Sequence, residues 1–293
     1  MIPGRGVNHV FSLQCPGLSW LLLVVAGMAW LAPAAAEYIT VDSDTLIRPS
    51  IALIIDDMGN QHGPGQQVVE LPGPVACAFL PFGHYTRNLA RQAHSRGKEV
   101  MLHLPMQSVS DDHTDQGGIV LDMTRRQFTR TLQTVLAAVP HVSGINNHRG
   151  SLITRHPGHM TWLMQSIREH GDLFFVDSRT TAATVAWRIA AEYGIPSIER
   201  NVFLDNDRQP DAVLAQFRRL VNIARRDGTA LGIGHPYPET LLVLAQELAR
   251  LDDYNIDIVS VNRLIEITNG SNQPWQMSSY PSHRAVKSLK PSP

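Results

Sequence analysis

A regular alternation through residues 51–251 limits the fold more than any other feature of the sequence. Short apolar runs rich in β-branched residues alternate with longer runs whose apolar residues recur at three- and four-residue spacing. The short runs predict buried strands and the long runs amphipathic helices, so we expect repeated βα units and a mostly parallel sheet. We predict strands at 51–55, 75–80, 99–104, 143–147, 173–176, 197–204 and 230–233, and an eighth at 256–261. We predict helices at 86–96, 125–139, 159–170, 181–193, 212–226 and 239–251.

Seven or eight such units in a single domain favour an α/β barrel, closed or nearly closed. A doubly wound open sheet is the alternative, because periodicity does not show whether a sheet closes. The chain has 25 Lys and Arg residues against 26 Asp and Glu residues. This near-neutral balance gives no electrostatic footprint for nucleic acid, so we expect no nucleic-acid partner.

The two ends of the chain differ in composition from its middle. Residues 1–36 hold one fixed charge, Arg5, a long apolar run and an Ala-rich ending, which together predict a cleaved signal peptide. The mature protein should then be periplasmic or secreted, without stable membrane insertion; an uncleaved N-terminal anchor is the alternative. A linker at 37–49, the barrel domain at 50–268 and a disordered tail at 269–293, rich in Gly, Ser, Asn, Gln and Pro, complete the expected organisation.

Polar side chains that can bind metal or transfer protons stand at the end of almost every predicted strand. In chain order they are Asp56, Asp57, His103, His148, Asp177, Asp205 and His235. In βα barrels the carboxyl ends of the strands meet at one rim, where active sites lie. The usual change from apolar strand to polar loop explains some of these charges, but it explains three histidines poorly. We therefore expect an active site at this rim.

Three of these residues are predicted to form a metal site. Asp57, His103 and His148 supply one carboxylate and two imidazoles, the ligand type used by hydrolytic zinc and by other divalent metals with open positions. Asp56 can serve beside them as a base only if the chain turns here, since neighbouring side chains on a strand point to opposite faces. Two structural alternatives remain: an aspartate caps the following helix, or His103 is a hydrogen-bonded core residue.

The other rim residues suggest proton transfer and ligand binding. His235 lies between glycines and prolines and suits a general acid, because imidazole titrates near neutrality; a fourth metal ligand is the alternative. Asp177 and Arg179 could orient the catalytic groups or form a structural ion pair. We expect contacts to a ligand from Asn147, Arg149, Ser151 and Tyr237.

Six motifs follow one another in a fixed order. They are Ile-Ile-Asp-Asp-Met-Gly at 54–59, His-Leu-Pro-Met at 103–106, Gly-Ile-Asn-Asn-His-Arg-Gly-Ser at 144–151, Phe-Phe-Val-Asp-Ser-Arg-Thr at 174–180, Asn-Val-Phe-Leu-Asp at 201–205 and Ile-Gly-His-Pro-Tyr-Pro-Glu-Thr at 233–240. In this order they resemble the motifs of the divergent polysaccharide deacetylases, a branch of the NodB-like carbohydrate esterase superfamily. The resemblance covers nearly the whole predicted domain.

The resemblance implies a single-domain, distorted (β/α)7-type barrel of the glycoside hydrolase and deacetylase kind and a divalent metal, commonly zinc. It also implies that Asp56 is the base, Asp57 a metal ligand and His103 the first of two ligand histidines. The second histidine of the family motif falls on Gln107 in this sequence. We predict that His148, from the next strand, replaces it.

The function predicted from these features is metal-assisted removal of acetyl groups, N-linked or O-linked, from a cell-envelope polysaccharide or a glycan fragment. Such an enzyme acts on carbon–nitrogen bonds other than peptide bonds. One alternative is a periplasmic glycan-binding or assembly protein that keeps the fold with weak or no catalysis, as Gln107 suggests. Another is a glycoside hydrolase with two carboxylates, against which the three histidines argue.

Overall fold

The structure is a computed structural model that describes residues 48–110 and 114–276. The predicted signal peptide at 1–36 and all of the predicted linker except its end lie outside the described residues. Among the helices of the described residues, none is long and apolar enough to cross a membrane.

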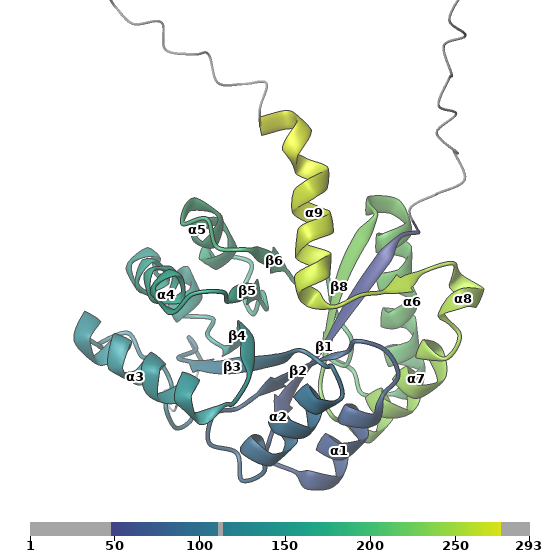
Figure 1. Ribbon diagram of the computed structural model, residues 1–293, viewed down its shortest axis with the longest axis horizontal. Helices are drawn as coiled ribbons and strands as arrows, with labels where there is room; N and C mark the ends of the chain where they lie inside the picture. The colour runs from purple at the N-terminus through teal and green to yellow at the C-terminus, as the bar shows by residue number, and fades with distance from the viewer. Residues whose placement is uncertain (1–47, 111–113, 277–293) are drawn as a thin grey trace, which may run out of the picture. The chain divides into compact units, whose positions relative to one another are not determined.

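Strands and helices alternate along the chain, as the periodicity predicts (Figure 1). The strands are β1 (Ser50–Met58), β2 (Ala76–Phe79), β3 (Val100–Met106), β4 (Val142–Arg149), β5 (Phe174–Asp177), β6 (Ser197–Glu199), β7 (Val202–Phe203), β8 (Thr229–Gly234) and β9 (Asp257–Ile258). The helices are α1 (His62–Glu70), α2 (Thr86–Ser95), α3 (Arg125–Ala138), the single turn η1 (Ile153–Arg155), α4 (Pro157–His170), α5 (Ala186–Glu192), α6 (Pro210–Asp227), α7 (Pro238–Leu248), α8 (Leu251–Tyr254) and α9 (Val261–Gln276).

The strands form one parallel sheet in the order β6-β5-β4-β3-β2-β1-β8-β7, with β9 beside the start of β1. The sheet curls, and helices α1 to α7 surround its outer side (Figure 1). The predicted α/β barrel is thereby confirmed. Within the described residues no ladder joins β6 to β7, so the barrel is open between these two edge strands.

The predicted strand at 197–204 is two strands on opposite edges of this opening. β6 pairs with β5, whereas β7 pairs with β8. Between them, the backbone N–H of Arg200 donates to the backbone carbonyl of Asp177 at 3.0 Å, and that of Asn201 donates to the backbone carbonyl of Leu231 at 2.9 Å. Consecutive residues therefore bond to different edges, and the chain itself crosses the opening. An apolar run in the sequence does not reveal this change of partner.

Side chains of β1 alternate between two apolar layers. Ile51 and Leu53 pack outward under the helices, whereas Ala52 and Ile54 face the barrel interior. The first turns of α9, including Val261, pack into the same interior. The carboxylate of Glu99, just before β3, accepts a hydrogen bond from the backbone N–H of Val261 at 2.6 Å. Helix α9 is thereby fixed at the amino-terminal end of the barrel, opposite the rim to which the strands bring their carboxyl ends.

Two helices differ from the sequence prediction. Helix α1 was missed because Gly63, Pro64 and Gly65 in its first turn are poor helix formers. Helix α9 continues to Gln276, past the point where the tail was predicted to begin at 269. Its buried first turns anchor it, so the polar residues that follow can continue the helix without apolar periodicity. The remainder of the predicted tail, 277–293, lies outside the described residues.

Gly59 lies where the loop after β1 meets the start of α2. Its φ is 109°, and a Cβ here would overlap Oγ1 of Thr86 and lie 3.2 Å from the Thr86 Cα. We expect Gly59→Ala to lower the free energy of unfolding by about 3 kcal/mol, through backbone strain and this clash. Gly97→Ala is the matched control: Gly97 has a φ of 73° but no atom within 4 Å of an added Cβ, so the loss should be about 1 kcal/mol. Urea unfolding measures both; equal losses would contradict the close packing at Gly59.

Candidate active site

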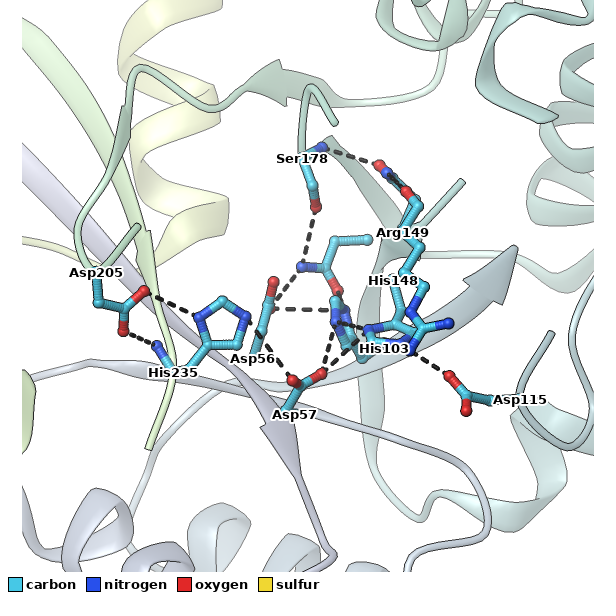
Figure 2. Close-up of polar contacts among 11 residues, drawn as sticks. Asp56, Asp57, His103, Asp115, His148, Arg149, Ser178, Asp205 and His235 are labelled. Carbon is cyan, nitrogen blue, oxygen red and sulfur yellow. Dashed lines mark hydrogen bonds and ion pairs between the residues drawn. The ribbon is translucent and has the colours of Figure 1, made fainter. Parts of the chain in front are cut away.

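Titratable side chains gather at the carboxyl ends of the strands, on the inner face of the sheet (Figure 2). Asp56 continues the alternation of Ala52 and Ile54 in β1 and therefore points into the barrel. His103 in β3 and His148 in β4 approach it from neighbouring strands, and His235 follows β8 (Figure 2). Asp56 and His103 are buried, whereas His148 and His235 are half-buried.

Asp57 joins this cluster because the chain turns at this residue. Its φ is 55°, in the left-handed region that residues other than glycine rarely adopt. The turn places Asp57 Oδ1 3.4 Å from His103 Nε2 and 3.1 Å from His148 Nδ1, and the two nitrogens lie 3.0 Å apart. The structure thus brings together the three residues nominated as metal ligands.

Hydrogen bonds to the two histidines show which ring nitrogens carry hydrogen. Asn146 Nδ2 donates to Asp56 Oδ1 at 2.7 Å, so its own oxygen faces His103 and accepts from Nδ1 at 2.9 Å. Asp115 Oδ2 accepts from His148 Nε2 at 2.9 Å. A neutral imidazole carries one N–H, so His103 Nε2 and His148 Nδ1 are left with lone pairs.

Three acceptor atoms therefore converge with no donor between them. They are Asp57 Oδ1, His103 Nε2 and His148 Nδ1, and Asp57 Oδ1 is buried without a hydrogen-bond partner among the described residues. Lone pairs this close repel one another unless a cation lies between them. Tetrahedral zinc, with bonds of about 2.1 Å, holds its ligand atoms roughly 3.4 Å apart. The three atoms therefore fit a divalent cation that keeps an open position.

The electrostatics of the cluster also favour positive charge at this point. Burial alone would raise the pKa of Asp57, but interaction with His103 and His148 holds it far below its usual range. Burial alone would lower the pKa of His103, but Asp56 and Asp57 raise it to about 9, so a proton on Nε2 takes the place of the cation when none is bound. Burial also raises the pKa of Asp56, against the opposing effect of His103. A carboxyl group with a raised pKa beside a cation site is suited to accept a proton.

His235 is held by Asp205, which follows β7. Asp205 Oδ1 accepts from His235 Nδ1 at 2.9 Å, while Oδ2 accepts from the backbone N–H of His235 at 2.6 Å and from Thr240 Oγ1 at 2.8 Å. His235 Nε2 is left facing the cluster, 3.8 Å from Asp57 Oδ2. Burial lowers the pKa of His235, but the bond to Asp205 and the nearby carboxylates raise it overall. Such an imidazole can carry a proton for a leaving group.

Among the described residues, neither Asp177 nor Arg179 forms a hydrogen bond or ion pair with His235, so their proposed role in orienting the catalytic groups stays a prediction. Buried Asp177 accepts from the backbone N–H of Arg179 at 2.9 Å and from Thr184 Oγ1 at 2.8 Å, so it shapes the loop between β5 and α5. Arg179 Nε lies 3.5 Å from a Glu199 oxygen. Asp205 orients the His235 ring instead. The sequence analysis placed Asp205 at the rim but assigned it no function.

The four residues predicted to contact a ligand have different surroundings. Asn147 and Arg149 line the pocket above the cluster, but both polar groups of Asn147 already bond to backbone, at 2.8 and 2.9 Å. Ser151 Oγ accepts from a backbone N–H in the loop after β3 at 3.1 Å. Tyr237 stacks on His235 with ring centroids 5.3 Å apart.

Gln107 turns away from the ligand cluster. Its Oε1 accepts from the backbone N–H of Leu121 at 2.9 Å. His148 supplies the second imidazole because β3 and β4 are neighbours, with His103 opposite Asn146 and Pro105 opposite His148. His148 therefore lies two residues further along the inner face of the adjoining strand.

The cluster opens into a pocket of about 350 Å³ at the rim. Its lining includes Asp56, His103, His148 and His235, together with Arg149, Arg179 and Arg200. Asn146, Asp115 and Arg200 were not singled out from the sequence. Asn146 lies in the polar segment 144–151 that also holds His148, whereas no sequence pattern marked Asp115 or Arg200.

Comparison with known proteins identifies the family. The chain matches the family model of the divergent polysaccharide deacetylases over residues 53–265. It belongs to this family. The resemblance inferred from the six motifs is thereby confirmed, and the curved parallel sheet is the fold expected of a divergent polysaccharide deacetylase.

Similar proteins occur in several bacteria. An uncharacterized protein of Haemophilus influenzae is 35% identical over 222 residues, which cover 76% of this chain and 79% of the relative. The uncharacterized protein YibQ of Escherichia coli is 33% identical over 244 residues, covering 83% of this chain and 74% of the relative. The crystal structure of an uncharacterized Agrobacterium tumefaciens protein shares the fold, with a TM-score of 0.71 and 21% identity over 74% of this chain and 89% of that one.

Asp115 is expected to set the metal affinity through His148. Asp115→Ala should weaken zinc binding about tenfold to a hundredfold, because a ligand histidine depends on the group that accepts its other N–H. Asp115→Asn keeps an acceptor oxygen and should lose less. Isothermal titration calorimetry with zinc compares the two variants, and unchanged affinity in Asp115→Ala would contradict this role.

Proposed function

We propose that this protein is a metal-dependent hydrolase of the cell envelope that removes acetyl groups, N-linked or O-linked, from a polysaccharide. The observation that carries the proposal is the convergence of Asp57 Oδ1, His103 Nε2 and His148 Nδ1, three acceptors with no donor between them. Membership in the divergent polysaccharide deacetylases supplies the reaction class. The predicted signal peptide supplies the expected location, periplasmic or secreted.

The side chains around the cluster divide the proton transfers between them. A divalent cation held by Asp57, His103 and His148, for which zinc is our proposal, would polarise the acyl carbonyl and lower the pKa of water. Asp56, buried and with a raised pKa, would take the proton from the attacking water. His235 would return a proton to the departing amine or alcohol through Nε2, while Asp205 holds its Nδ1.

Acetate release from acetylated envelope glycans tests the proposal. The purified protein should release acetate after incubation with zinc, lose this activity with a chelator and regain it when metal is restored. Asp56→Asn should bind metal normally and release little acetate. A protein that binds metal and glycan but releases no acetate would instead be the binding or assembly protein considered as the alternative.

A further inference from the structure

The pocket carries a group of positive charges that the proposed reaction does not use. Arg149, Arg179 and Arg200 line it beside the catalytic cluster. Of these, Arg179 lies 3.5 Å from a carboxylate oxygen of Glu199. The whole chain has a formal net charge of −1, so the concentration of arginine belongs to this pocket and not to the protein as a whole.

Arg200 is fixed in place by its neighbours. Its Nε donates to the carbonyl of Ser178 at 2.7 Å, and its Nη2 donates to the carbonyl of Arg179 at 3.0 Å. The guanidinium also lies over the ring of Phe203, 5.1 Å from the centroid. These contacts use part of the guanidinium fork and leave further N–H donors for a ligand in the pocket.

Among the described residues, Arg200 has no direct counter-ion. No carboxylate of the described residues lies within 4.0 Å of its nitrogens, and Asp56 and Asp177 act on it only from further away. Burial and the neighbouring charge of Arg179 lower the pKa of Arg200 against the attraction of Asp56 and Asp177, in keeping with the energetic cost of burying a charge that has no close counter-ion. An anion in the pocket would remove that cost.

The backbone around the pocket is strained at the same place. Arg149 has a φ of 53° and Arg179 a φ of 50°, and Asp57 shares this left-handed conformation. Arginine has no local preference for it, and strained residues of this kind concentrate at functional sites. The loops after β4 and β5 therefore adopt a costly conformation where they bring arginines to the pocket.

We propose that the pocket recognises an anionic group, a carboxylate or a phosphate, on the glycan that carries the acyl group, and that Arg200 binds it. The proposal rests on the proposed function in that the same glycan occupies the site. A guanidinium fork matches two oxygens of either anion, with geometric specificity that a lone ammonium lacks. The substrate class is then an acidic acylated glycan.

A purely structural role for Arg200 is the competing explanation, because its two hydrogen bonds tie the loop after β5 to the segment between β6 and β7. If this role were the only one, a substitution that removes the two hydrogen bonds would weaken the binding of acidic and neutral ligands equally. A role in anion recognition would instead change the ratio of the affinities for acidic and neutral ligands. The ratio is therefore the quantity to measure.

Binding of three sugars to the full chain tests the proposal. N-acetylglucosamine is neutral, N-acetylmuramic acid adds a carboxylate to the same acetamido sugar, and an N-acetylglucosamine phosphate adds a phosphate. We expect the wild type to bind an acidic sugar about tenfold to a hundredfold more tightly than the neutral one, the range of a hydrogen bond to a charged group. The ratio should fall to near one in Arg200→Gln. It should be partly kept in Arg200→Lys, which retains charge without the fork.

The outcomes separate this proposal from the proposed function. Equal binding of acidic and neutral sugars by the wild type, or a ratio that survives Arg200→Gln, would overturn the anion site. Should Arg200→Gln not fold, a full ratio in Arg200→Lys would do so. A preference for acidic sugars without acetate release would support the anion site while counting against the deacetylase. Acetate release at equal rates from acidic and neutral glycans would support the deacetylase and count against the anion site.

Discussion

Asp57→Ala is expected to remove the metal from the protein and to lower the kcat of acetate release by about a thousandfold or more. Asp57 Oδ1 is the one anionic member of the three convergent acceptors and lies within 3.4 Å of both ligand nitrogens. Without it two neutral imidazoles remain, fewer protein ligands than catalytic zinc normally has. His148→Ala should have the same effect, because it also leaves two ligands. Elemental analysis of the purified variants and acetate-release assays measure the two losses.

Gln107→Ala is the matched control for these variants. The Gln107 side chain bonds to the backbone of Leu121, so its removal should leave the metal content unchanged. If Gln107→Ala lost the metal while His148→Ala kept it, the second ligand would be Gln107 and not His148. A wild-type protein that takes up no zinc would contradict the metal site as a whole.

The barrel and its rim could be predicted because they depend on local patterns. Each buried strand of a parallel sheet is a short apolar run, and parallel strands bring their carboxyl ends to one rim whatever their order. The candidate ligand set of Asp57, His103 and His148 followed from the residues at that rim. Which rim residues touch one another depends on the order of the strands, and a single sequence does not contain that order in readable form.

Asp177 and Asp205 illustrate this limit. Both follow predicted strands, so the sequence offers no way to choose between them as the partner of His235. The sheet makes the choice: β7 pairs with β8, with Phe203 opposite Ile233, and this register carries Asp205 to His235. Asp177 ends β5, which pairs with β4 and β6 on the other side of the barrel opening.

Asp57 illustrates a second limit. Strand alternation assigns its side chain to the outer face, away from Asp56, and a turn was needed for the two to work together. A φ of 55° provides that turn. No residue in the motif forces an aspartate into this conformation. The sequence therefore showed that a turn was needed at Asp57, but it did not show that the chain turns there.

Asp205→Asn is expected to lower kcat by about a hundredfold to ten-thousandfold while the metal content stays unchanged. Asp205 Oδ2 accepts two hydrogen bonds, from the backbone N–H of His235 and from Thr240 Oγ1. An asparagine must place its oxygen there, which turns its amide nitrogen toward His235 Nδ1. Two N–H groups cannot face each other, so the ring must keep its hydrogen on Nε2 and loses the carboxylate that stabilises its protonated form.

Asp205 acts through His235 in this account, so the two substitutions should not be additive. In a His235→Ala background, Asp205→Asn should change kcat by less than about twofold, the error expected when no coupling partner remains. A full further loss in the double variant would show that Asp205 supports the site by another route, such as its bond to Thr240. Non-additive kcat with unchanged metal in all three variants would instead place the leaving-group proton on His235 Nε2. Protonation of the leaving group would then depend on a pair of residues that the register of β7 on β8 brings together.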